Sequence, residues 1–154
     1  MENFHASIKD YIMKHNLDAS HIITSKSCHT VHDAAIAIGA SSHEFVKNIC
    51  MMDTENQLIV AIVKGEDRAS TSRVAKALNI VRPRLATEEE IQSLTGFPLG
   101  GVPSFGFKAT FLIDSNVTEL THIYTGGGSP YSLVKIDVKS MINVNGGKVV
   151  RIRK

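Results

Sequence analysis

The stretch that decides the fold is FVKNICMMDTENQLIVAIVKG, residues 45–65. Two apolar segments flank the turn-rich sequence TEN, a pattern that predicts two antiparallel strands joined as a hairpin. The second segment, QLIVAIVKG, is apolar at consecutive positions, as is typical of a strand buried on both faces. We therefore expect this hairpin to form the heart of the sheet, with its second strand in a central position.

Helix signals lie on both sides of the hairpin. Apolar spacing predicts an amphipathic helix over residues 3–15, and Thr30 or Ser27 can cap a second helix that ends at Gly39. A cap among residues 70–72 predicts a helix through RVAKALN, Thr87 with Glu90 forms a capping box for EEEIQSL, and Asp137 can start a short last helix.

Further strands are expected in HIITS, FLID, HIYTG, YSLVKID and, after the NGG turn, KVVRI. Strands and helices interleave without the regular βαβ rhythm of a parallel sheet. The prediction is therefore an α+β fold with a mixed, largely antiparallel sheet flanked by helices.

Composition indicates one cytoplasmic domain over residues 1–154, with 43% apolar and 21% charged residues. The longest apolar run, residues 58–63, is too short to cross a bilayer, and the first ten residues lack the layout of a signal peptide. Cys28 and Cys50 do not make a disulfide framework and are expected to remain thiols. We expect no membrane partner.

The net charge of +2 is small, but basic residues gather in two segments, residues 64–84 and 148–154. If these segments meet in space, they could hold a phosphate backbone, whereas the alternative is an ordinary solvated basic face. The candidates for backbone contact are Arg73, Lys76, Arg82, Arg84, Arg151 and Arg153.

Strand alternation places Lys47 on one face of the first hairpin strand and Asn48 on the other. A lysine among apolar neighbours must reach solvent, find an acceptor or lose its proton. A ligand with acceptor oxygens could supply the partner, and a lysine that reaches solvent from an edge strand is the alternative.

The loop FPLGGVPSFGF, residues 97–107, holds three of the eleven glycines and two of the four prolines of the chain. Adjacent glycines allow the backbone to approach a ligand, while prolines limit its freedom. The loop, and TGGGSP at 125–130, could each form a pocket wall or a purely structural connection.

Other chemistry has weaker support. Cys28, His29 and His32 lie close together, but no second ligand pair stands at zinc-site spacing. No nucleophile elbow, phosphate-binding loop or dinucleotide fingerprint is present. We therefore expect no metal, no cofactor and no covalent nucleophile.

FVKN, TGFPLGGVPSFG, FLID and HIYTGGGSP, in this order and spacing, resemble the YbaK and prolyl-tRNA-synthetase-associated editing domain family over residues 30–145. The resemblance implies the curved sheet of that family and a free-standing trans-editing deacylase, which hydrolyses the ester of a mischarged tRNA. It also implies tRNA as a partner, with an aminoacyl-tRNA synthetase as a second candidate partner.

Residue by residue, the resemblance makes Lys47 the functional side chain. It implies that the loop at Gly100, Gly101, Val102 and Pro103 shapes the pocket for the aminoacyl group and terminal adenosine. We expect glycine amides to act as oxyanion donors, Asn48 to assist, and a water or a ribose hydroxyl to be the attacking or proton-relaying group. The glycines with the expected donor role are Gly100, Gly101, Gly127 and Gly128.

Two departures bear on the substrate: Phe107 stands where the family pattern suggests a histidine, and SKSCHTVHD lacks the tyrosine of some cysteine-specific members. The expectation is therefore a small residue, such as alanine, on tRNA for proline or a similar tRNA. The alternative is a noncatalytic module that binds an aminoacyl end or a nucleotide in the same pocket.

Overall fold

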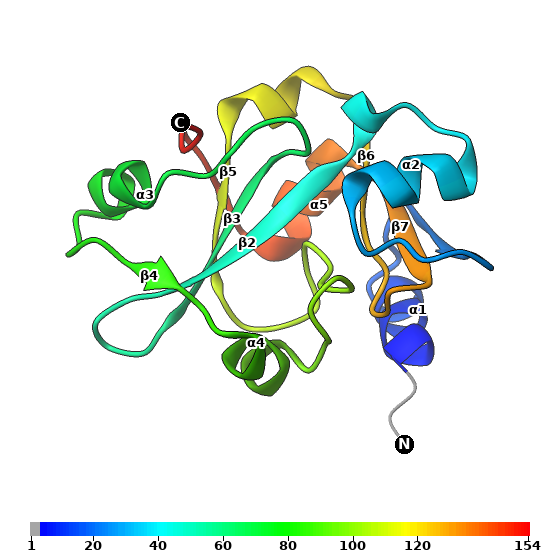
Figure 1. Ribbon diagram of the computed structural model, residues 1–154, viewed down its shortest axis with the longest axis horizontal. Coiled ribbons are helices and arrows are strands. Elements are labelled where there is room, and N and C mark those ends of the chain that lie inside the picture. Colours follow the sequence, from blue (N-terminus) through cyan, green and yellow to red (C-terminus); the bar gives the residue numbers. More distant parts are fainter. Residues whose placement is uncertain (1–3) are drawn as a thin grey trace.

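The protein, described here by a computed structural model, is an α+β assembly of two sheets (Figure 1). The structure describes residues 4–154, with side-chain surroundings from residue 7 onward. The five-stranded sheet has the order β4-β2-β3-β5-β8, and its strands are β4 (Arg84–Leu85), β2 (Val46–Met52), β3 (Leu58–Lys64), β5 (Thr110–Ile113) and β8 (Lys148–Val149). The three-stranded sheet has the order β1-β7-β6, with β1 (Ala19–Ile23), β7 (Ser132–Asp137) and β6 (His122–Gly126).

The hairpin of β2 and β3 is confirmed as the centre of the larger sheet. The two strands pair antiparallel without interruption from Val46 opposite Lys64 to Met52 opposite Leu58. On β3, Val60 packs into the main core while Ala61 packs into the cluster on the opposite face, and both are fully buried. The continuous apolar run of β3 is therefore explained by burial on both faces.

Local caps begin the helices where the sequence predicts them. Thr30 accepts a hydrogen bond from Asp33 N, Ser70 from Arg73 N and Asp137 from Ser140 N, and Thr87 and Glu90 form the capping box. The helices are α1 (Phe4–Lys14), α2 (Val31–Ile38), α3 (Thr71–Leu78), α4 (Glu88–Thr95) and α5 (Val138–Asn145), with short 3₁₀ turns η1 (Ser42–Glu44) and η2 (Ser115–Glu119).

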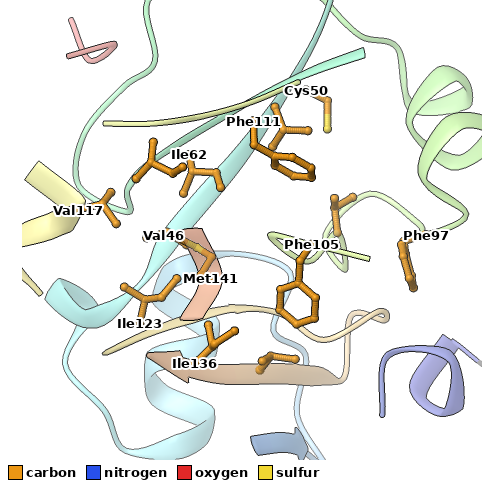
Figure 2. Packing of buried hydrophobic residues seen from close by; sticks show 14 of the residues in the cluster. Val46, Cys50, Ile62, Phe97, Phe105, Phe111, Val117, Ile123, Ile136 and Met141 are labelled. Carbon is orange, nitrogen blue, oxygen red and sulfur yellow. The ribbon is translucent and has the colours of Figure 1, made fainter. Parts of the chain in front are cut away.

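The main core fills the space between the two sheets (Figure 2). Ile62 and Val46 enter it from the larger sheet, Ile123 and Ile136 from the smaller one, and Phe105 from the 97–107 loop. Phe105 is fully buried, so the apolar loop is partly a core element. Helix α3 and the C-terminal segment cover the other face of the larger sheet.

The predicted α+β class with mixed, largely antiparallel pairing is confirmed. The alternation of elements did not predict two separate sheets, which are linked by a parallel bridge between Phe45 and Tyr124. The last strand, expected over KVVRI, is limited to Lys148–Val149, and the start of the expected first helix, residue 3, lies outside the described residues.

Two expectations from composition can be compared with the fold. Cys28 and Cys50 are free, buried thiols, as expected. No helix within residues 4–154 is long and apolar enough to cross a bilayer.

The buried Asp114 carboxylate fastens the C-terminal segment to the end of β5. It accepts hydrogen bonds from Ile152 N at 2.8 Å and from the Arg153 guanidinium at 3.1 Å, and it also caps η2. Burial by itself would raise the pKa of this carboxyl, but backbone N–H groups of Ile152, Asn116 and Arg153 hold it below its ordinary value.

We predict that Asp114→Asn lowers the free energy of unfolding by about 2–4 kcal/mol at neutral pH, because the variant loses charge-assisted hydrogen bonds inside the protein. Urea unfolding followed by circular dichroism measures this change. Since the folded pKa is depressed, the wild-type contribution is present above the ordinary value of 3.8 and is lost as the pH falls below it. The difference between wild type and variant should therefore shrink in acid.

The matched control is Asp137→Asn, because asparagine caps a helix about as well as aspartate. Equal stability of the Asp114 and Asp137 variants would contradict this account of the C-terminal attachment.

Candidate functional site

A cavity of about 500 Å³ lies along the outer edge of β2. Its walls come from four parts of the chain that are distant in sequence. They are β2 with Phe45 before it, residues 28–32 and Ala34 at the start of α2, the 97–107 loop and β6, and the single residues from other segments that complete the lining are Gly65, Ile91 and Leu133. The cavity therefore forms at the junction of the two sheets.

Backbone groups on the edge of β2 face this cavity. β4 pairs with β2 only at Met51 and Met52, and β6 meets its other end only at the bridge from Phe45. Ala86 N, directly after β4, also donates to Cys50 O at 2.9 Å. Between these contacts, no strand of the described chain pairs with the outer edge at residues 46–49, all of which line the cavity. An uncovered strand edge offers N–H and C=O groups to a ligand.

Lys47 enters the cavity as a half-buried ammonium group. Within residues 4–154 it has no hydrogen bond and no ion pair. Burial lowers the pKa of Lys47, the nearby Arg68 lowers it further, and Asp67 opposes the shift. A partly desolvated cation without a fixed partner is suited to binding an acceptor oxygen.

Asn48 lies on the opposite face of β2, as predicted, and forms the centre of a hydrogen-bond ring. Its Nδ2 donates to Val102 O and to Thr125 Oγ1, both at 2.9 Å. Ser104 Oγ donates to Asn48 Oδ1 at 2.7 Å and lies 2.7 Å from Thr125 Oγ1, which must therefore donate to it. Both amide hydrogens of Asn48 are occupied, so its side chain positions the loop instead of donating to a ligand.

The glycines of the two loops allow their backbones to pack against each other. A side chain at Gly101 would meet the backbone of Ser129 at 2.7–2.9 Å, and one at Gly126 would overlap the carbonyl of Val102. Gly128 N donates to Gly101 O at 2.8 Å. The two glycine-rich segments thus form one double wall, which only residues without a side chain permit at these positions.

The structure brings together only part of the predicted pocket. Lys47, Asn48, Gly100 and Val102 line the cavity, whereas Gly101, Pro103, Gly127 and Gly128 lie outside its lining. The amides of three predicted donors are used internally: Gly101 N binds Pro98 O, Gly127 N binds Ser132 O, and Gly128 N binds Gly101 O. The expected donor role is therefore open to Gly100 and not to these three glycines.

The cavity also contains residues for which the sequence suggested a different use or none. His29 and His32, considered with Cys28 as metal ligands, line the cavity, but no metal-binding cluster occurs within the part of the chain that the structure describes. Tyr124 was missed, and Thr125 was considered only as the first residue of TGGGSP, a possible pocket wall. The position of Tyr124 directly before TGGGSP was the available signal, but only the bridge from β6 to Phe45 places it at the site.

The two basic segments meet next to this site. Ala69 bridges Arg153, Ser70 N donates to Ile152 O, and Lys154 N donates to Arg68 O. Arg73, Lys76 and Arg151 are exposed, whereas Arg82 donates to Thr71, Arg84 is paired with Glu90, and Arg153 is paired with Asp114.

The aminoacyl-tRNA editing domain family has a model that matches residues 25–144, and the chain belongs to this family. It is 23% identical over 119 residues to the proline--tRNA ligase of Brachyspira hyodysenteriae, a match that covers 75% of this chain and 21% of the ligase. The chain thus spans about a fifth of the length of the ligases it matches. The uncharacterized protein YwhH of Bacillus subtilis is 22% identical, with 78% of this chain and 77% of YwhH covered.

Solved structures agree with the fold. The crystal structure of a proposed trans-editing enzyme for prolyl tRNA synthetase superposes with a TM-score of 0.88 and 22% sequence identity. The superposition covers 100% of this chain and 99% of that one. At this identity the likeness establishes the shared fold.

We predict that Asn48→Ala lowers the free energy of unfolding by about 2–4 kcal/mol, because it leaves buried partners without hydrogen bonds. The matched substitution Lys47→Met removes an unpaired ammonium and should leave the urea midpoint unchanged or higher. Urea titration of both variants measures the difference. A wild-type midpoint for Asn48→Ala would show that the ring is not a structural element.

Proposed function

We propose that this protein is an aminoacyl-tRNA deacylase that acts in trans and hydrolyses the ester between a wrong amino acid and tRNA. The observation that carries the proposal is the unpaired, half-buried Lys47 in a 500 Å³ cavity of an editing-family chain. Action in trans is supported by the similarity to the trans-editing structure over nearly its whole length. The ligase relatives support tRNA for proline as the tRNA.

Ester hydrolysis needs a positioned water and donors for the developing oxyanion, not a strong covalent nucleophile. In the proposal, Lys47 donates a charge-assisted hydrogen bond to an acceptor oxygen of the aminoacyl-adenosine end. Gly100 can add an amide donor, because its N–H has no hydrogen-bond partner within residues 4–154. The uncovered edge of β2 offers further backbone groups beside Lys47.

The double wall bears on which amino acids the cavity can accept. The wall is held by the Asn48 ring and by glycine contacts, so the cavity has limited freedom to expand around a large side chain. We propose that a small residue such as alanine is accepted and that larger residues are excluded by shape.

Deacylation of a panel of correctly charged and mischarged tRNAs tests the function. We expect rapid release of a small amino acid from tRNA for proline, and a loss of about 100-fold or more in Lys47→Ala, since an oxyanion or substrate contact of this kind contributes two to three orders of magnitude. Lys139→Ala, an exposed lysine on α5 outside the cavity, serves as the control and should retain the wild-type rate.

The competing function, a noncatalytic binding module, predicts stable binding of the aminoacyl end with no turnover. Release of no amino acid from any tRNA, together with measurable binding, would establish that alternative. Loss of activity in Lys139→Ala would show that the assay reports general damage.

The tRNA backbone is proposed to lie on the basic surface where residues 68–76 meet residues 151–154. Arg68 connects this surface to the cavity, because it is close enough to influence the pKa of Lys47. Contacts to phosphates position the acceptor end without reading its sequence. Arg73, Lys76 and Arg151 are exposed residues in this role, while Arg82 is bonded to Thr71, and Arg84 and Arg153 already have carboxylate partners.

We predict that replacing Arg73, Lys76 and Arg151 together by alanine weakens tRNA binding and flattens its salt dependence. Each phosphate contact that is lost should reduce the slope of log affinity against log salt by about 0.7–0.9. Filter binding at several salt concentrations measures the slope. An unchanged slope would place the tRNA on another surface.

A further inference from the structure

The proposed reaction requires a group that accepts a proton from the attacking water. Within residues 4–154, no aspartate or glutamate lines the cavity. The titratable side chains that do line it are Cys28, His29, His32, Lys47, Cys50 and Tyr124. General bases work best when they change charge near the working pH, and histidine does so near neutrality.

The other cavity groups are less suited to this task. Lys47 is the cationic donor of the proposed reaction. Burial raises the pKa of the Cys50 thiol to about 11, so Cys50 remains protonated at neutral pH. Tyrosine and free cysteine ordinarily titrate above neutrality. His29 and His32 are the remaining candidates.

Geometry distinguishes the two histidines. A β-carbon placed on Gly100 would lie 2.5 Å from His29 Nδ1 and 3.1 Å from its Cε1. The edge of the His29 imidazole therefore occupies the space beside the Gly100 α-carbon, in the residue whose amide is free to act as a donor. Gly100 has a φ of +87°, and its missing side chain leaves the room that this ring occupies.

Hydrogen bonds hold the backbone around His29, whereas its ring makes none within the described residues. Cys28 N donates to Pro130 O, and His29 N donates to Ser27 Oγ at 3.2 Å. Within residues 4–154 the imidazole has no hydrogen bond and no ion pair, so either ring nitrogen can accept a proton. His32 is the second residue of α2, and the three atoms nearest to that β-carbon all belong to His29 and none to His32.

We propose that His29 is the general base of this deacylation; the inference rests on the proposed function. The imidazole takes a proton from water as the water oxygen bonds to the ester carbonyl carbon, and Lys47 with the Gly100 amide stabilises the oxyanion. When the tetrahedral intermediate collapses, the bond from carbon to the ribose oxygen breaks, and the imidazolium returns its proton to that oxygen. The products are the free amino acid and tRNA with its terminal hydroxyl restored.

The test is single-turnover deacylation by wild type, His29→Gln and His29→Ala from about pH 5.5 to 8.5, the range in which histidine titrates. His32→Gln tests the other candidate base, and His15→Gln, at an exposed histidine outside the cavity lining, is the control that should retain the wild-type rate. We expect the wild-type rate to rise with pH and then level off, and His29→Gln to lose that bend together with about 100-fold in rate, the lower end for general base catalysis. Added imidazole should restore part of the activity of His29→Ala.

Binding provides a second measurement. His29→Gln should bind a tRNA that carries a nonhydrolysable, amide-linked amino acid as tightly as wild type does, because the base acts on the water. Weakened binding that accounts for the whole loss of rate would overturn the assignment in favour of a positioning or structural role.

The remaining outcomes separate this inference from the proposed function. Wild-type rate and pH profile in His29→Gln, with activity lost in Lys47→Ala, would overturn the role of His29 and leave the deacylase intact. A loss of deacylation rate in His32→Gln equal to that in His29→Gln would also overturn the assignment to His29. No release by the wild type from any tRNA would overturn the proposed function and this role with it.

Discussion

The hydrogen-bond ring of Asn48, Ser104 and Thr125 is the interaction on which the shape of the cavity depends. It joins β2 to the 97–107 loop through Ser104 and to β6 through Thr125. These two residues lie 56 and 77 positions from Asn48 along the chain. Ser104 is fully buried and Thr125 is 1% exposed, so each hydroxyl must find its partner inside the protein. Because every donor in the ring has one acceptor, the ring admits one relative placement of the three segments.

The glycine contacts follow from this placement. Once the ring draws the 97–107 loop towards β6, the backbones of residues 101–102 and 126–129 come too close for side chains. The wall therefore uses its polar backbone groups to hold itself together. Apart from the amide of Gly100, the groups left for a ligand are those at the open edge of β2 and at Lys47. Most of the wall therefore serves stability, and ligand binding is left to these few groups.

Features that depend on neighbouring residues could be predicted from the sequence. The caps at Thr30, Ser70 and Thr87 each join a side chain to a backbone group three residues away, and the central place of β3 follows from its own composition. Features that depend on distant pairs could not. The alternation of β2 places Asn48 opposite Lys47, but nothing local indicates that Val102 and Thr125 are its partners.

The glycine-rich loops illustrate the same limit. Their composition predicts close approach of a backbone, and the structure confirms close approach, but to a second loop as well as to a cavity. Similarly, the positive charge of Arg153 is evident from the sequence, whereas its ion pair with Asp114 joins residues 39 positions apart along the chain. Local chemistry indicates what a residue can do, and tertiary packing decides which partner uses it.

The charge of the cavity has a consequence for how the proposed deacylase obtains its affinity. Among the described residues, the lining contains Lys47 and two histidines but no carboxylate, so the α-ammonium of an amino acid finds no ion-pair partner in the lining. A free amino acid therefore gains little from this pocket, and binding energy must come from the tRNA through its phosphates and terminal adenosine. Shape then decides which aminoacyl groups reach the ester position, and the hydrolysed product has little reason to stay. Such a site can scan many charged tRNAs without being blocked by the cellular pool of free amino acids.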